Sequence, residues 1–163
     1  MTIDAPLELH RDKVRPEWID YNGHMNVAYY VLAFDYATDA FFDFLGLDEG
    51  YRERSGNSTF AVEAHLTYQR EVAEGDPLRF TTQLLGFDHK RLHFLHHMYH
   101  ADEGFLAATS EWLSLHIDLR VRRVSAMTES LKDRLAEIMD AHEGLPRPPE
   151  VGRVIKCPKR PGS

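Results

Sequence analysis

The chain has 163 residues, of which 43% are hydrophobic and 28% charged, a composition typical of one water-soluble globular domain. Its formal net charge of −7 argues against a nucleic-acid-binding protein, because such proteins present a basic face to phosphates. A single cysteine excludes an intrachain disulfide, and the first residues lack the basic and then apolar pattern of a signal peptide. We therefore expect a cytoplasmic protein that is not attached to a membrane.

The first third of the chain predicts one strand followed by one long helix. Residues 7–15 alternate weakly between apolar and polar side chains and predict a strand that ends before Pro16. Asn26 is a preferred helix N-cap, the run 27–45 is apolar around most of its circumference, and Gly46 is a natural stop. Such a helix belongs in a core. Three acids at four-residue steps exclude a membrane span: Asp35, Asp39 and Asp43. They form the one edge of the helix that we expect to face solvent.

Four consecutive strands are predicted after a polar loop at 47–58. They cover residues 59–72, 78–87, 91–101 and 105–119. Alternation in the first of them predicts one shared face for five side chains: Phe60, Val62, Ala64, Leu66 and Tyr68.

The end of the chain predicts a helix and a tail. Residues 122–127 are a candidate for a further short strand that completes the sheet. A helix capped by Thr128 and stopped by Gly144 follows. We expect a single domain at 1–145 and a Pro-rich, basic tail at 146–163 that is only partly ordered.

This order of elements predicts an α+β fold in which one central helix lies on an antiparallel sheet. One sheet wrapped around a helix leaves the other side of that helix poorly covered. The sequence therefore predicts association with a second subunit.

Polar, turn-forming residues are concentrated directly before the long helix, in the segment DYNGHMN at residues 20–26. One interpretation is a turn with a helix cap, and the other is an active site. A helix N-terminus offers free N–H groups and a favourable dipole end for a developing oxyanion, and Asp20 can act as a nucleophile or a base. Gly23 permits close approach of a ligand. His24 either donates a hydrogen bond to the substrate or fastens the loop.

With DYNGHMN opening a buried helix, residues 7–142 resemble the hotdog-fold thioesterases of the 4-hydroxybenzoyl-CoA thioesterase type. The resemblance implies a five- or six-stranded antiparallel sheet wrapped around a long central helix, plus a C-terminal helix. It implies hydrolysis of an acyl-CoA by Asp20, with the backbone N–H of Val27, seven residues later, polarising the thioester. No cofactor is implied, since coenzyme A is part of the substrate. Residues 14–46 resemble the betainyl-CoA thioesterases of carnitine breakdown.

Several further side chains are candidates for substrate binding. Trp18 stands where many relatives carry a second acid, which leaves the acyl preference open. Aromatic rings near the motif suit a quaternary ammonium group, although core packing is the alternative: Trp18, Tyr21, Tyr29 and Tyr30. Asn26 is expected beside the substrate as the helix cap. Glu63 and His65 share the other face of their strand and are either substrate contacts or exposed strand residues.

The phosphates of coenzyme A require cations in an otherwise acidic protein. The local basic groups are "HKR", with Lys90 and Arg91, and "LRVRRV". The second of these contains three arginines: Arg120, Arg122 and Arg123.

The histidines at 93, 96, 97 and 100 have the spacing of helical zinc ligands. On a strand, however, the pairs lie too far apart to chelate, and His96 and His97 point to opposite faces. We therefore predict no metal site, and expect several of these histidines at the surface or at a subunit interface.

Two alternative functions stay open: a non-catalytic acyl-CoA-binding hotdog protein, and a hotdog dehydratase, whose motif order differs. The sequence leaves the acyl group, the choice between homodimer and homotetramer, and direct or water-mediated attack by Asp20 undecided.

Overall fold

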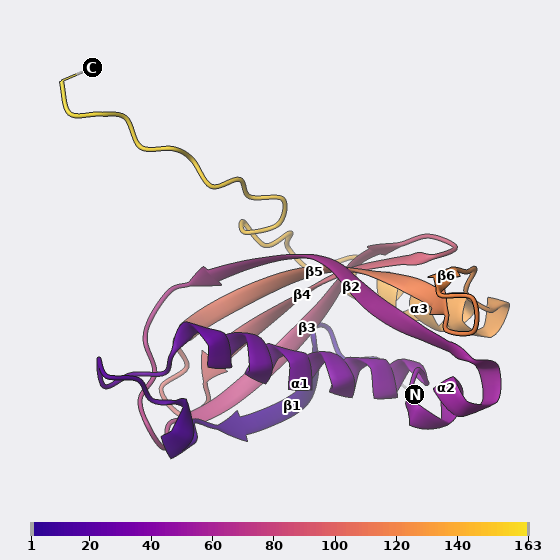
Figure 1. The fold of residues 1–163 in the computed structure, drawn as a ribbon, viewed down its shortest axis with the longest axis horizontal. Helices are drawn as coiled ribbons and strands as arrows, with labels where there is room; N and C mark the ends of the chain where they lie inside the picture. The colour runs from indigo at the N-terminus through magenta and orange to yellow at the C-terminus, as the bar shows by residue number, and fades with distance from the viewer. Residues whose placement is uncertain (1, 163) are drawn as a thin grey trace.

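A computed structural model describes residues 2–162, in which one antiparallel sheet curls around a long helix (Figure 1). In chain order the elements are β1 (Leu7–Lys13), the 3-10 turn η1 (Pro16–Trp18), α1 (Val27–Leu45), α2 (Glu49–Ser55), β2 (Asn57–Tyr68), β3 (Pro77–Phe87), β4 (Arg91–His100), β5 (Leu106–Asp118), β6 (Arg123–Val124) and α3 (Glu129–His142). The strands are ordered β1-β3-β4-β5-β2, and β6 pairs with β5. The α+β expectation and the central helix are confirmed.

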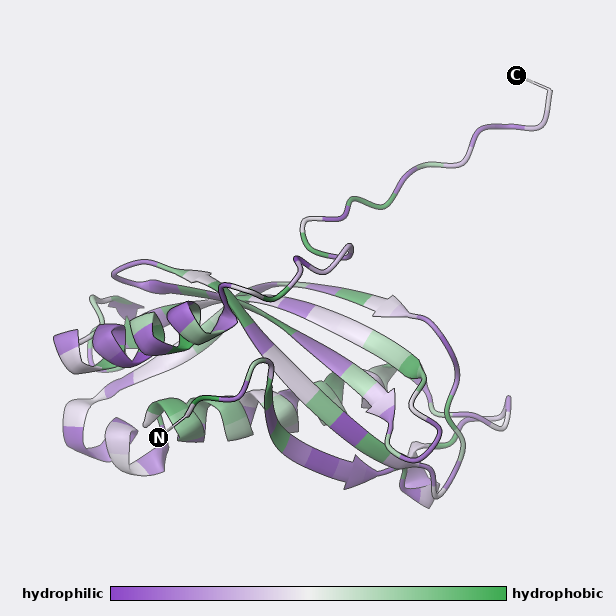
Figure 2. Ribbon diagram, turned by 180° about the vertical axis from the view of Figure 1, so that it is seen from behind, coloured by the Kyte–Doolittle hydropathy of each residue, from purple (hydrophilic) through white to green (hydrophobic). Residues whose placement is uncertain are grey.

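Helix α1 begins and ends where its cap residues predict. The Asn26 side chain accepts a hydrogen bond from the Ala28 N–H, and Gly46 adopts the left-handed conformation that glycine tolerates best, with φ of 81°. Rings on the inner face of α1 pack against the sheet, as Phe34 does on Phe80 and Phe41 on Phe94. Figure 2 shows predominantly apolar residues along α1 and hydrophilic ones over much of α3. The helix therefore supplies the centre of the core.

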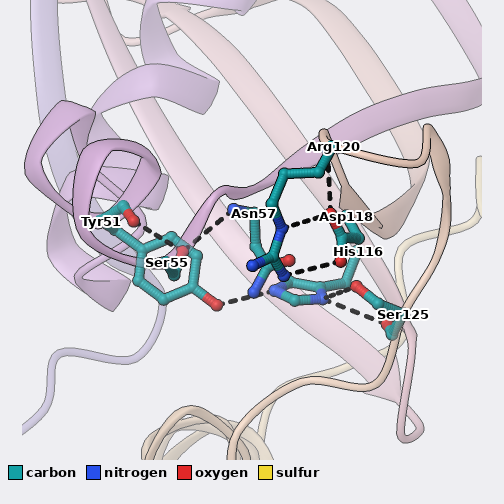
Figure 3. A network of polar contacts seen from close by, with 7 residues as sticks. All are labelled: Tyr51, Ser55, Asn57, His116, Asp118, Arg120 and Ser125. Carbon is teal, nitrogen blue, oxygen red and sulfur yellow. Dashed lines mark hydrogen bonds and ion pairs between the residues drawn. The ribbon is translucent and has the colours of Figure 1, made fainter.

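The loop expected at 47–58 is wrong, because α2 forms within it. Asp48 caps this helix through the Tyr51 N–H, and Gly56 ends it. The Tyr51 hydroxyl lies 2.7 Å from His116 Nε2, and His116 Nδ1 lies 2.9 Å from the Ser125 hydroxyl (Figure 3). This network ties α2 to β5 and to the segment after β6. Helices are predicted from the periodic spacing of apolar residues, and an exposed helix of seven residues lacks that spacing.

The single face predicted for β2 is also wrong in its first half. Ala61 pairs with Ser114 and Glu63 with Leu113, so Val62 is an extra residue in a β-bulge. The bulge moves Phe60 to the outer face of the sheet, away from α1. Leu66 keeps its predicted place in the core, and Tyr68 its predicted contact with the helix.

One long edge of the sheet is open. Strand β2 pairs only with β5 among residues 2–162, so its second edge carries unsatisfied backbone groups. On the same side of the molecule the outward face of α1 exposes Val27 and Val31. Association with a second subunit stays a prediction.

The C-terminal part divides into a packed segment and an extended one. Helix α3 packs its apolar side on Phe41, Leu45 and Leu7. Residues 146–152 then cross the outer face of the sheet, where the Gly152 N–H donates to Glu111 at 2.9 Å and Glu150 is buried. Residues 153–162 extend away from the body (Figure 1). The strand expected at 122–127 is reduced to the two residues of β6.

Candidate active site

The loop before α1 is a tight, doubly anchored turn. The Gly23 N–H donates to the Asp20 carbonyl at 3.0 Å, and the Asp20 N–H donates to the His24 carbonyl at 3.1 Å. Gly23 has φ of 81°, a conformation costly for any residue with a Cβ. Trp18 and Met25 are buried on either side of the turn. The sequence therefore holds a short polar loop in place by burying its two ends.

The Asp20 carboxylate is oriented from within this loop. Oδ1 accepts from the Asn22 N–H at 2.8 Å, and Oδ2 lies 3.4 Å from the Asn26 side-chain amide. The Asn26 Oδ1 in turn caps α1. One asparagine thus links the acid to the first turn of the helix.

The first amide of α1 is free to act on a ligand. The Val27 N–H has no acceptor among the described residues, and the Val27 side chain is 56% exposed. An unpaired N–H at a helix N-terminus, next to the residue that holds Asp20, is suited to a carbonyl oxygen that gains negative charge.

The His24 ring nitrogens lie beside groups other than the Asp20 carboxylate. Its Nδ1 lies 3.3 Å from the Met25 carbonyl, and its Nε2 lies 3.7 Å from the Glu71 carboxylate. These contacts fasten the loop to the segment after β2 and favour the structural role over a direct contact with a substrate.

The aromatic residues predicted near the motif do not converge on one site. Trp18 is 2% exposed and stacks on Tyr29 with ring centroids 6.0 Å apart. The Arg15 guanidinium lies over the Trp18 ring, 4.8 Å from its centroid. Tyr30 is buried edge-on against Tyr68, and this burial raises the pKa of the Tyr30 phenol. Tyr21 is 96% exposed at the loop tip. Within one chain these rings pack the loop rather than form a cage.

Glu63, the other candidate acid, lies away from Asp20. The pairing of Glu63 with Leu113 and of His65 with Glu111 places both side chains on the outer face of the sheet, as the alternation of β2 after its bulge requires. Within one chain they do not face the Asp20 loop.

The basic residues lie at the opposite end of the sheet. Arg120 pairs with Asp118 at 2.8 Å, and Arg91 with Asp88 at 2.7 Å. Arg122 lies 5.4 Å over the Phe60 ring, and Arg123 is exposed on β6. This is the end where β2 begins, whereas the Asp20 loop lies where β2 ends, as the 3.5 Å contact of the Tyr68 hydroxyl with the Val27 carbonyl shows.

The histidine-rich strand β4 does not build a site. His96 points inward to Thr38 and Thr82, and His97 points outward, as predicted. His96 and His100 are buried within this chain, whereas His93 and His97 are partly exposed. Within residues 2–162 no three His, Cys, Asp or Glu side chains are grouped as metal ligands, and no helix is long and apolar enough to cross a membrane.

One feature escaped sequence reasoning. A cavity of about 750 Å³ lies between α1, α2, β2 and β5, and Asp35, Asp39 and Asp43 line it together with Trp112 and Ser114. We call it the acidic cavity. The four-residue spacing of the aspartates predicts a shared helix face, but the opposite wall comes from a strand about 70 residues later.

Comparison with known proteins shows the family to which the chain belongs. A family model described as the thioesterase-like superfamily matches residues 14–135. The chain belongs to the thioesterase-like superfamily. It is a hotdog-fold thioester hydrolase.

Relatives of known sequence and structure support this membership. The chain is 43% identical to a betainyl-CoA thioesterase of Pseudomonas aeruginosa, over 93% of this chain and 96% of that protein. It is 40% identical to an L-carnitine dehydrogenase/betainyl-CoA thioesterase of Agrobacterium fabrum, of which it spans 31%. A hypothetical Staphylococcus aureus protein solved in complex with CoA superposes with a TM-score of 0.87 at 30% identity, covering 97% of this chain and all of that one. A putative thioesterase from Pseudomonas putida gives 0.82 at 38% identity, covering 96% and 99%.

Proposed function

We propose that this thioesterase hydrolyses acyl-CoA thioesters whose acyl group is small and positively charged, with betainyl-CoA as the first substrate to test. The observation that carries the chemistry is the Asp20 carboxylate held beside the unpaired N–H of Val27 at the start of α1. The name of the Pseudomonas aeruginosa relative supports the acyl group. Substrate and water are sufficient for the reaction, so we propose no cofactor, and we propose a cytoplasmic location.

Hydrolysis then follows from the loop geometry. The thioester carbonyl accepts the Val27 N–H, which stabilises the oxyanion as the carbonyl carbon becomes tetrahedral. Asp20 either takes the proton of an attacking water or attacks the carbonyl itself to form an anhydride that water later cleaves. In both routes the C–S bond breaks, the acyl group leaves as a carboxylate, and the sulfur of coenzyme A ends as a thiol.

We propose a homodimer formed by antiparallel pairing of two β2 edges. Such pairing satisfies the open edge and brings the end of β2 at Tyr68 beside the start of β2 in the second copy. The Asp20 loop of one copy then lies close to Arg122 and Arg123 of the other. Pantetheine would follow the seam, with its nucleotide phosphates outside it on these arginines. A tetramer of two such dimers is compatible with this arrangement.

Light scattering at micromolar concentration should give a dimer or tetramer; a stable and active monomer would contradict the proposal.

Thiol release across a panel of acyl-CoA substrates tests the catalytic assignment. Asp20→Asn should reduce kcat by about 10²–10⁴-fold, because an amide is neither a base nor a comparable nucleophile. Asp102→Asn, an exposed aspartate in the turn after β4, serves as the matched control and should behave as the parent. Near-parental turnover in Asp20→Asn would remove Asp20 from the mechanism and make Glu63 the next candidate.

The same panel tests the two alternative functions. A non-catalytic acyl-CoA-binding protein would bind the substrates without releasing thiol. A dehydratase would hydrate an enoyl-CoA and leave the thioester intact.

A further inference from the structure

The acidic cavity has an unusual charge arrangement for a helix surface. Asp35, Asp39 and Asp43 follow one another at four-residue steps on α1, and none of them forms an ion pair within residues 2–162. Asp48 and Glu49 from the start of α2 also line the cavity, and its lining contains a single basic residue, Arg52.

This arrangement is unfavourable for the isolated helix in two ways. Like charges four residues apart repel each other, and the C-terminal half of a helix favours cations rather than anions. The last turn of α1 contains Asp43 and no basic residue. Partial burial, together with Asp35 and Asp43, raises the pKa of Asp39. A cation placed in the cavity would relieve both kinds of repulsion.

The opposite wall independently indicates a ligand. Ser114 is 2% exposed, lies on the side of β5 that faces α1, and its hydroxyl forms no hydrogen bond with any described residue. The protein buries this side chain on every side except that of the cavity, so its hydroxyl stays open to a ligand there.

Trp112 and Phe42 give the cavity aromatic walls. The Trp112 indole N–H is satisfied by Ser110 at 2.8 Å, so the ring has no polar atom left to bond. Aromatic faces beside carboxylates are the groups that bind quaternary ammonium ions in water.

The cavity also lies where the reaction needs it, if the proposed dimer forms. Its floor includes Ser58, Thr59 and Ala61 at the start of β2, whereas Tyr68 at the end of β2 contacts the Asp20 side of α1. Antiparallel pairing of two β2 strands therefore brings the acidic cavity of one copy toward the Asp20 loop of the other.

Resting on the proposed function, we infer that the acidic cavity binds the ammonium end of the acyl group while Asp20 of the second copy acts on the thioester. In betainyl-CoA the trimethylammonium group is one methylene from the carbonyl. A specificity site for this charge must therefore adjoin the reacting atoms, which an intersubunit cavity next to the Asp20 loop would satisfy.

A pair of isosteric substrates separates charge from shape. 3,3-Dimethylbutyryl-CoA replaces the ammonium nitrogen of betainyl-CoA with carbon and keeps the three methyl groups. We expect the parent to prefer betainyl-CoA, and the double variant Asp35→Asn/Asp39→Asn to lose that preference by about 10–100-fold in the ratio of the two kcat/KM values. The control Asp102→Asn/Asp140→Asn removes two exposed carboxylates far from the cavity and should keep the ratio. Light scattering and a thermal melt verify that each variant is folded and associated.

The outcomes separate this inference from the proposed function. An unchanged ratio in Asp35→Asn/Asp39→Asn, with a parent that prefers betainyl-CoA, overturns the cavity assignment and leaves the proposed substrate in place. A parent that cleaves both substrates equally overturns the cationic substrate, and the cavity assignment with it. A parent that cleaves neither, yet cleaves other thioesters in the panel, has the same consequence.

Discussion

His96 should make the stability of the fold depend on pH. Its Nε2 lies 2.9 Å from the Thr38 hydroxyl, which itself donates to the Phe34 carbonyl, so the ring must donate to Thr38 from Nε2. Its Nδ1 then accepts from the Thr82 hydroxyl at 2.8 Å. Burial of the ring, and to a lesser extent His97 and His10, lowers the pKa of His96 to about 3. The neutral ring therefore ties β4 to the middle of α1.

The magnitude follows from the proton balance. The unfolded chain binds a proton on His96 below pH 6.5, and the folded chain does so only below about pH 3. In that window the free energy of unfolding falls by about 1.4 kcal/mol per pH unit as the pH is lowered. This stabilisation is complete above pH 6.5, and about 2 kcal/mol of it is lost by pH 5, a sizeable share of the 5–15 kcal/mol typical of a domain.

Urea unfolding at several pH values measures this effect. His96→Leu should be less stable than the parent at neutral pH, because the Thr82 hydroxyl loses its partner, but its loss of stability between pH 6.5 and 5 should be smaller by about 2 kcal/mol. The other histidines contribute equally to the pH dependence of stability in both proteins. His89→Gln, an exposed histidine in the turn before β4, is the control and should keep the parental pH dependence. Equal pH dependence of His96→Leu and the parent would refute a buried, neutral His96.

Two further changes probe the charged groups. Asp39→Asn should raise the free energy of unfolding by about 0.4–1 kcal/mol, since it removes two i,i+4 repulsions, and this gain should shrink at high salt. Thermal melts measure the gain, with Asp140→Asn as the control. A melting temperature below that of the parent would contradict the prediction. Arg122→Ala combined with Arg123→Ala should raise KM for an acyl-CoA more than it lowers kcat, and much less so for an acyl-pantetheine that lacks the nucleotide phosphates. If both substrates behave as with the parent, the nucleotide binds elsewhere, with Lys90 and Arg91 as the next candidates.

The elements that were predicted correctly are those with local signals. Asn26 and Gly46 mark the ends of α1, and Thr128 marks the start of α3, because cap residues bond to backbone groups two or three positions away. The errors lie where a local signal is weak. Helix α2 is too short and exposed for periodicity, and the bulge at Val62 depends on how β2 matches β5. The burial of His96 depends on Thr38 and Thr82, which the fold brings from two other elements.

The sequence by itself determined the turn that holds Asp20, because its main hydrogen bonds lie within residues 18–28: the turn at Gly23, the Asn26 cap and the first free amide of α1, although the Met25 N–H also donates to the Val72 carbonyl from the segment after β2. Hydrogen bonds over so short a span follow from residue type and order. Only the tertiary structure decided what faces the second half of α1. Asp35, Asp39 and Asp43 are exposed, as the predicted solvated edge requires, but α2, β2 and β5 make that edge one wall of a cavity and bury most of Ser114 beside it. Burial is a property of packing between distant segments, and no local pattern of residues reports it.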